Sequence, residues 1–512
     1  MSEDLTWTRV HPVTPAVKGW KVLAVIIAIA AQQVASVRDA EDVVRTLGWG
    51  PLIAVIAGAL VVGFVYATIA WRMTRYAVDA EAIYLQTGVL FRQQRSARLD
   101  RIQAIDVVQP VLARILGLAE LKMEVAGGSD SAVRLSYLKE ESAQALRNAL
   151  LARAAGLEFG TEAQPEAPVA PEREVISVPA SRLVVSLLRS PVLGIPVVLF
   201  VGVVVVIAVT GEFSIVFGML PVLLASGGYL WQRFAGEFGF RAAQSPDGIR
   251  LRHGLLEART QTVPPGRVQA VRLSQPFLWR SKDWWRVQVN VAGYGKTDEQ
   301  QTESVLLPVG DRHEALLALW LVLPDLGTDD PRPLLDSALS GGTSGEPSSA
   351  PPAGSATAEP AADDFVTSPR AARWLDPWSW SRNGYAVTPH AILVRRGRFQ
   401  REVVVVPHAR TQSLGLRQGP LQRRLGLATV ILHSTPGPVT PMVTHLEAFV
   451  AGRLVGEQAG RARTARAGAG PERWMLEMRA PMRVGAPPPP MSTQLPPPPV
   501  PATTPPSPVP PS

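Results

Sequence analysis

Three Arg-x-Gln elements recur along this chain of 512 residues. In each, an arginine and a glutamine stand two positions apart, so on an extended strand both side chains point to one face. A guanidinium group beside a carboxamide can hold a carboxylate or a phosphate. The alternative is that both side chains tie down a neighbouring loop through backbone carbonyls, as their recurrence in a shared fold favours. The candidate anion- or partner-binding residues are Arg101, Gln103, Arg267, Gln269, Arg410 and Gln412.

A fixed spacing surrounds each element and indicates an internal repeat. A glycine precedes each arginine by 13 residues, at Gly88, Gly254 and Gly397. A basic residue follows each arginine by 13 residues, at Arg114, Arg280 and Arg423. Chance does not keep this register three times, so we expect three copies of one fold.

The sequence lacks the residues that several other kinds of site would require. The chain contains no cysteine, which excludes disulfides, thiolate zinc sites and a cysteine nucleophile. The seven histidines are scattered without a metal-binding spacing, and no phosphate loop or serine nucleophile motif occurs. The net charge of +8 comes from dispersed arginines, and no nucleic-acid-binding module is recognisable. We therefore expect a protein that is not an enzyme, with no cofactor, no metal and no nucleic-acid partner.

The composition indicates membrane segments, because 46% of the residues are hydrophobic and only 18% are charged. Uncharged runs at 51–70, 192–209 and 214–230 are long enough, or nearly so, to cross a bilayer, and 17–37 is a weaker candidate. Lysine and arginine gather on one side of the expected spans. This places both termini and all three repeats in the cytoplasm, at the inner membrane of a bacterium.

Each repeat is expected to be an antiparallel sheet followed by a helix. Short β-rich runs are separated by Asp, Pro and Gly, as in hairpins. The motifs Asp311-x-x-Glu314 and Thr444-x-x-Glu447 precede apolar runs, as in the capping boxes that begin helices.

The first repeat carries W-x-x-T-R-Y (71–76), R-I-Q-x-I (101–105), R-x-L-G (114–117) and V-A-G-G (125–128) in that order. This order resembles the type 2 bacterial pleckstrin-homology (PH) domains of the YdbS/YdbT-like membrane proteins. The second repeat departs most, with Asp283-Trp284-Trp285 where Leu-Gly is expected. The resemblance implies an α+β multidomain membrane protein. It would have two transmembrane helical hairpins and three PH-like antiparallel β-barrels, each capped by a C-terminal helix.

The expected organisation follows from these segments. It comprises transmembrane hairpin 1 (17–71), PH-like domain 1 (72–155), a linker (156–173), transmembrane hairpin 2 (186–231), PH-like domain 2 (232–326), a disordered linker (327–368), PH-like domain 3 (369–457) and a basic, then proline-rich, disordered tail (458–512). Trp374 and Trp378 either rest in the membrane interface or pack against the third repeat. The tail is either a docking ligand in polyproline II form or a solvated spacer.

The functional expectation is a non-enzymatic binding or scaffold protein at the cytoplasmic face of the membrane. Its partners would be membrane lipids, including anionic headgroups, and a membrane or cytoplasmic protein whose identity the sequence does not give. Arg92, Arg95 and Arg98, and likewise Arg395, Arg396 and Arg398, would face anionic lipid if they lie on the membrane side. The alternative function is an accessory subunit of a membrane transport or envelope-defence system.

Overall fold

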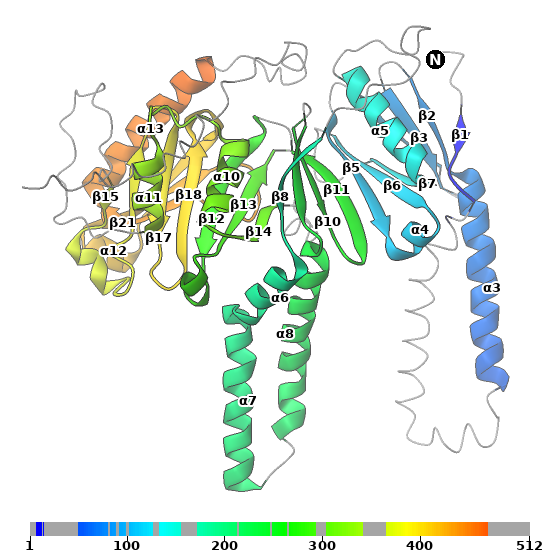
Figure 1. Cartoon of the computed structure of the whole chain (residues 1–512), viewed down its shortest axis with the longest axis horizontal. Helices are drawn as coiled ribbons and strands as arrows, with labels where there is room; N and C mark the ends of the chain where they lie inside the picture. Colours follow the sequence, from blue (N-terminus) through cyan, green and yellow to red (C-terminus); the bar gives the residue numbers. More distant parts are fainter. Residues whose placement is uncertain are drawn as a thin grey trace, which may run out of the picture.

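The computed structural model describes residues 7–12, 14, 50–79, 82–88, 92–98, 102–125, 133–154, 172–211, 215–245, 248–263, 266–292, 304–340 and 365–468. Three repeats lie in a row, and long helices leave the row on one side (Figure 1). The expected internal repeat is confirmed, because one order of strands and helices occurs three times.

The first repeat contains β1 (Thr8–Arg9), β2 (Arg75–Val78), β3 (Ala82–Thr87), β4 (Gln93–Arg98), β5 (Ile102–Pro110), α4 (Val111–Ile115), β6 (Leu118–Val125), β7 (Val133–Lys139) and α5 (Glu140–Ala154). The second contains β8 (Arg173–Ser177), β9 (Arg241–Ser245), β10 (Gly248–His253), β11 (Glu257–Val263), β12 (Val268–Gln275), η2 (Phe277–Lys282), β13 (Trp285–Val291), β14 (Val305–Gly310) and α10 (Arg312–Val322). The third contains β15 (Val366–Thr367), η3 (Arg370–Trp374), β16 (Gly384–Val387), β17 (Ala391–Arg396), β18 (Arg401–Pro407), η4 (His408–Arg410), β19 (Ser413–Arg417), α12 (Pro420–Arg424), β20 (Leu427–His433), β21 (Met442–Glu447) and α13 (Ala448–Gly468).

The recurring glycine stands directly after β10 in the second repeat and after β17 in the third, at a turn whose geometry requires glycine. Gly254 and Gly397 have φ angles of +113° and +76°, in a region that favours glycine. A Cβ atom at either position would lie 2.0 Å from a backbone carbonyl oxygen, that of Glu257 or Gln400. The spacing that reveals the repeat therefore begins at a turn that only glycine can make.

The expected antiparallel sheets with helices are confirmed, but the sheets cross the boundaries between repeats, so the repeats are not three closed barrels. Four strands of one repeat join three strands of the preceding repeat in each of two seven-stranded sheets, ordered β7-β6-β5-β11-β10-β9-β8 and β14-β13-β12-β18-β17-β16-β15. The ends of the row hold the incomplete sheets β1-β2-β3-β4 and β19-β20-β21. We call the pairings β5–β11 and β12–β18 the internal joints.

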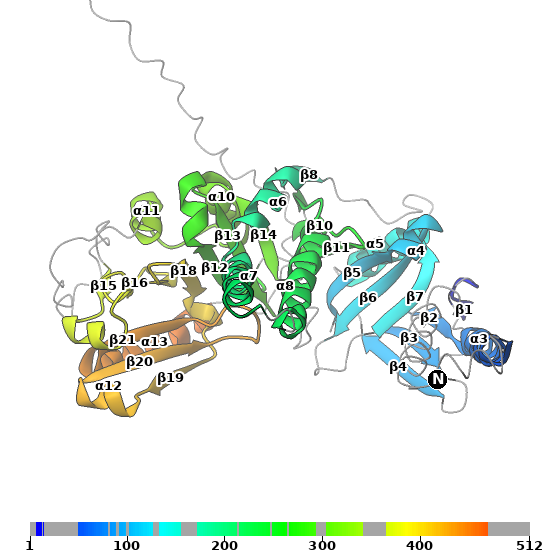
Figure 2. The ribbon, with the colours of Figure 1, turned by 90° about the horizontal axis from the view of Figure 1, so that it is seen from below.

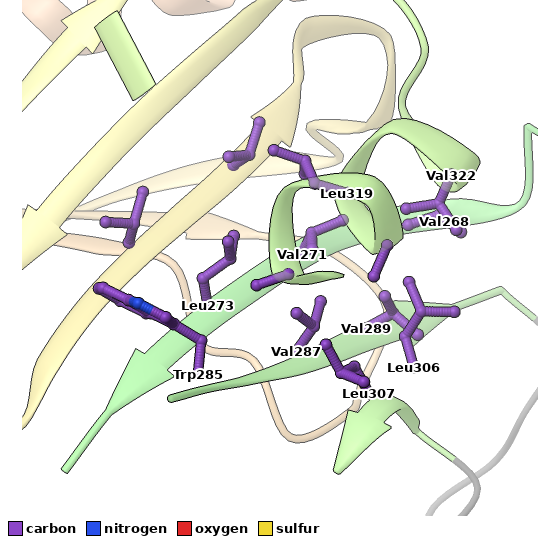
Figure 3. Packing of buried hydrophobic residues seen from close by; sticks show 14 of the residues in the cluster. Val268, Val271, Leu273, Trp285, Val287, Val289, Leu306, Leu307, Leu319 and Val322 are labelled. Atoms are coloured by element: carbon purple, nitrogen blue, oxygen red, sulfur yellow. The ribbon is translucent and has the colours of Figure 1, made fainter. Parts of the chain in front are cut away.

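The core of the second repeat lies between α10 and the strands β12, β13 and β14 (Figure 3). Alternating apolar residues of β12 and β13, such as Val271, Leu273 and Val287, are fully buried beneath the helix. The capping box predicted at Asp311 is confirmed, with the Asp311 carboxylate accepting from the Glu314 amide at 2.8 Å. Leu393, Val403 and Val405 of the third repeat belong to the same cluster, so the core continues across the joint.

Three long helices leave the row of repeats on one side (Figure 1). They are α3 (Gly50–Met73), α7 (Pro191–Thr210) and α8 (Ile215–Glu237), and the short helix α6 (Ala180–Leu188) precedes α7. Among the described residues, only α7 is long and apolar enough to count as a membrane span by length and composition. It pairs with α8 as an antiparallel hairpin (Figure 1). The predicted span at 17–37 lies outside the described residues, as do almost all of 156–173 and residues 469–512.

Two predicted disordered segments are partly ordered. A helix, α11 (Arg332–Ser340), lies inside the expected linker 327–368, and its Leu334, Leu335, Ala338 and Leu339 are buried in the core. Helix α13 continues to Gly468, so it includes the first eleven residues of the segment expected as tail. The capping box expected at Thr444 is wrong, because Thr444 and Glu447 belong to β21 and the helix begins only at Ala448.

Candidate functional site

In the second repeat, one end of the strands lies against the base of the long helices. The backbone amide of Leu255, in the β10–β11 turn, donates to the carbonyl of Ala235 in α8 at 2.7 Å. The indole of Trp279 in η2 donates to the carbonyl of Ser186 in α6 at 3.0 Å. We call this the helix-proximal end, and the opposite end of the strands the distal end.

A short connector at this end occupies the same place in every repeat. The connectors are α4, η2 and α12, which follow β5, β12 and β19. A proline at 110, 276 or 420 precedes or begins each one, and because proline lacks a backbone N–H, a strand does not continue through it. Figure 1 shows α4 and α12 at the lower edge of the row, on the side where the long helices leave.

The connectors expose large apolar side chains next to basic ones. Ile115 in α4 is 75% exposed, Phe277 in η2 is 59% exposed and Leu421 in α12 is 61% exposed. The basic residue that the repeat spacing predicts, Arg114, Arg280 or Arg423, lies on the same connector each time. Apolar and basic groups together suit the boundary between acyl chains and anionic headgroups.

An arginine cluster lies beside η2, at the helix-proximal end of the second internal joint. Its members are Arg280, Arg382, Arg395, Arg398 and Arg401, from η2, the segment before β16, the end of β17, the β17–β18 turn and the start of β18. The Arg280 guanidinium donates to the carbonyl of Phe399 at 3.1 Å, which joins the connector to that turn.

The charges of the arginine cluster act on one another. Burial, together with the nearby charges of Arg401, Arg395 and Arg280, lowers the pKa of Arg382 to about 9. Partial burial and the charges of Arg401 and Arg398 also lower the pKa of Arg280. The Arg382 guanidinium donates to the carbonyl oxygens of Ala338 and Leu339, which are neutral. An anion placed here would relieve the mutual repulsion of several guanidinium groups.

The described residues of the Arg-x-Gln elements lie elsewhere. In the second repeat, Gln269 is 4% exposed and its amide donates to the carbonyl of Arg267 at 3.3 Å. In the third, Arg410 ends η4 and is half-buried, whereas Gln412 is exposed. Arg101 lies outside the described residues, and of Gln103 only the position in β5 is described. The elements thus stand at the distal end, and anion or partner binding by them stays a prediction.

The elements of the second and third repeats border one cavity of about 900 Å³. Its lining includes Val268, Trp320 and Leu326 as apolar residues and Arg410 and His390 as polar ones. The Arg410 guanidinium reaches the turn before β12, where a Cβ on Gly266 would lie 3.4 Å from its Nη2. This cavity faces away from the long helices, because the β9–β10 and β16–β17 turns that line it are at the distal ends of their strands.

A buried ion cluster connects the second helical hairpin to the second repeat. Glu237, the last residue of α8, accepts from Arg286 of β13 at 2.6 Å and from Arg233 at 3.3 Å. Burial opposes ionisation of Glu237, but the two guanidinium groups outweigh it and lower its pKa. The carboxylate therefore stays charged and fixes the helix to the sheet.

Sequence reasoning identified the repeated basic residue and the 395–398 arginines, but it did not identify the connectors as a site. The exposed apolar residues Ile115, Phe277 and Leu421 stand next to polar ones in short segments that read as ordinary turns. Trp374 and Trp378 are 72% and 62% exposed, and Trp378 contacts Phe399 with ring centroids 5.8 Å apart. In the described part of the chain, no group of three or more His, Cys, Asp or Glu side chains could hold a metal ion.

The comparisons with known proteins agree with this architecture. The sequence profile described as Bacterial PH domain matches residues 23–154, 190–319 and 366–453, one match for each repeat. The UPF0699 transmembrane protein YdbT of Bacillus subtilis (strain 168) is 23% identical over 286 residues, which cover 50% of this chain and 57% of that protein. No solved structure matches the chain. A profile that matches well over half of the residues, three times in register with the repeats, shows that the chain belongs to the Bacterial PH domain family.

Proposed function

We propose that this protein is a membrane-anchored, non-enzymatic scaffold that binds anionic lipid headgroups with the helix-proximal end of its repeats. The repeats would lie at the cytoplasmic face of a bacterial inner membrane, held there by helical hairpins. The observation that carries the proposal is the recurrence of an exposed apolar and basic connector at one end of all three repeats. Packing of the core does not explain why exposed apolar and basic residues recur three times on the side where the long helices leave, so we assign them a binding role.

The energies favour contact with a membrane surface. A basic residue near an anionic leaflet contributes roughly 1 kcal/mol, and inserted apolar side chains add to this. The helices hold the repeats close to the surface, so weak contacts act at a high effective concentration. The arginine cluster would supply the strongest single headgroup site, because several guanidinium groups converge there.

Site-directed labelling tests the position of the connectors. Because the chain contains no cysteine, a thiol-reactive fluorophore attaches only to the cysteine that is introduced. The variants Ile115→Cys, Phe277→Cys and Leu421→Cys would each carry a polarity-sensitive fluorophore in full-length protein reconstituted into nanodiscs. We expect blue-shifted emission, quenched by spin-labelled lipids, at all three positions. The control is Pro389→Cys in the β16–β17 turn, which is exposed at the distal end and should show neither effect.

Lipid composition tests the charge component. We expect the blue shift of the Phe277→Cys label to be larger in nanodiscs with phosphatidylglycerol than in phosphatidylcholine alone. The substitutions Arg280→Gln and Arg398→Gln should reduce this difference, while Arg463→Gln, an exposed arginine on α13, should not. Emission typical of a water-exposed fluorophore at all three connectors, in both lipid compositions, would refute the proposal.

A further inference from the structure

The two internal joints have the same register, although different repeats form them. In the first joint Val108 of β5 pairs with Arg259 of β11, and in the second Ser274 of β12 pairs with Glu402 of β18. Val108 and Ser274 both lie seven residues after the arginine of their own Arg-x-Gln element. Arg259 and Glu402 both lie eight residues before that arginine in theirs. The joint is therefore a property of the repeat, formed in one way wherever two repeats meet.

Among the described strands, each end of the row carries one half of this joint that has no partner strand. Strand β4 occupies the place of β11 and β18, and it is the last strand of its sheet. Strand β19 occupies the place of β5 and β12, and it too borders its sheet. Figure 2 shows β4 in the first repeat and β19 in the third, with the whole second repeat between them. Such edges present unpaired backbone groups to another chain.

The burial of equivalent residues shows what the free ends lack. Val107 and Leu273, six residues after the arginine in the first and second repeats, are 5% and 0% exposed. The residue at the same place in the third repeat is Leu416, which is 55% exposed. A leucine on an open strand edge at a position that is covered in both other repeats indicates a missing neighbour.

We infer that β19 of one copy pairs with β4 of a second copy, antiparallel and in the register of the internal joints. The register places Leu416 opposite Gln94 and Arg417 opposite Gln93. Arg95 of β4 stands opposite Gly415, so no two like charges face each other directly. The arginines of β4 would deter strands that carry basic residues at those positions, and β19 has none there.

The pairing is head to tail, so each addition leaves a free β4 at one end and a free β19 at the other. Copies would therefore form rows or closed rings, according to the rotation between successive copies. The helices α3, α7 and α8 all leave the row on one side, so copies joined in this way keep their membrane helices in one membrane (Figure 1).

Cysteine cross-linking of full-length protein in phosphatidylcholine vesicles tests the register. The double variant Gln94→Cys/Leu416→Cys, treated with a mild oxidant, should give a ladder of dimers, trimers and larger species on a non-reducing gel. In an antiparallel ladder, directly opposite residues alternate between pairs whose side chains lie farther apart and pairs whose side chains lie closer together. A disulfide forms more readily in the closer pairs. The adjacent pair Gln93→Cys/Arg417→Cys therefore covers the other case, and one of the two should react readily.

Single-cysteine variants distinguish head-to-tail pairing from other contacts. Gln94→Cys alone and Leu416→Cys alone should give no cross-linked dimer, whereas an equal mixture should give dimers and nothing larger. The control Gln94→Cys/Leu421→Cys has its second cysteine on an exposed residue off the strand and should give no ladder. Dimers from either single variant, a ladder from the control, or no ladder from either opposed pair in folded protein would each overturn the inference.

A charge on the edge provides a second test. We expect Leu416→Arg to slow cross-linking of the Gln93→Cys/Arg417→Cys pair about tenfold, because a fourth cation would join Arg92, Arg95 and Arg98. Since Leu416 is exposed in the single chain, the Leu416→Arg substitution should not change the thermal unfolding of the protein. Unchanged cross-linking would overturn the inference, and the neutral vesicles keep this result separate from headgroup binding.

Discussion

The second and third repeats share a fold but differ in what covers their equivalent strands. In the second repeat β12 lies in the middle of a seven-stranded sheet, with a neighbour on each side. In the third repeat β19 begins a three-stranded sheet, and its side chains are exposed or half-buried. The same residue position is therefore core in one repeat and surface in the other. Position in the row, rather than the local sequence alone, decides which residues stabilise this protein.

The largest expected effect tests how firmly the second repeat is attached to its helices. Glu237→Ala would leave the guanidinium groups of Arg233 and Arg286 buried without their carboxylate, at a cost of about 3–5 kcal/mol of unfolding free energy. Arg182→Ala breaks the partly exposed ion pair with Glu314 and should cost about 0–1 kcal/mol. Thermal unfolding in detergent measures both, and equal shifts would contradict the buried cluster as an anchor.

A matched pair of leucines tests the comparison itself. Leu273→Ala removes a fully buried side chain next to the second internal joint and should destabilise the chain by about 2–5 kcal/mol. Leu416→Ala makes the same chemical change at the equivalent place and should cost less than about 0.5 kcal/mol in monomeric protein. Denaturant unfolding monitored by tryptophan fluorescence gives both values. Similar losses would mean that β19 is covered in the monomer.

The smallest expected effect is a pH dependence that belongs to the third repeat. His408 is buried, its Nδ1 accepts from the Gln458 amide and its Nε2 donates to the carbonyl of Thr388. Burial lowers the pKa of His408, and burial also lowers that of His445. The unfolded chain therefore takes up protons first as the pH falls below about 6.5, and stability declines there.

Thermal unfolding at pH 7.5 and pH 5.5 measures this loss. His408→Gln should reduce the difference between the two conditions, with His445 supplying the remainder. The second repeat has Pro265 at the place of His408, so the unfolding transition of the second repeat should change less between the two pH values. A third repeat that is more stable at pH 5.5 than at pH 7.5 would reverse the expected sign.

The repeat unit could be predicted from the sequence because its spacing reflects local geometry. The glycines at 88, 254 and 397 all have positive φ angles, and the capping box at Asp311 begins a helix as its motif indicates. The joints could not be predicted, because the strand sequences do not show which edge meets which. Thr444-x-x-Glu447 has the motif of a helix start, but Glu447 pairs with Leu427, so strand pairing decided the conformation.

The candidate site was predictable only in part. The basic residues at 114, 280 and 423 followed from the spacing, yet their use depends on which end of the strands the helices join. Composition also concealed α11: the polar linker around it suggested disorder, while Leu334, Leu335, Ala338 and Leu339 form an apolar stripe at helical spacing.

The shared register has a consequence for the length of such proteins. Because β5 pairs with β11 in the same alignment as β12 with β18, β5 would also be compatible with β18. Removing the second repeat together with its helical hairpin would bring the first and third repeats together through that pairing. Duplicating the same segment would lengthen the row by one unit. The gene can thus gain or lose whole modules without any new interface having to evolve.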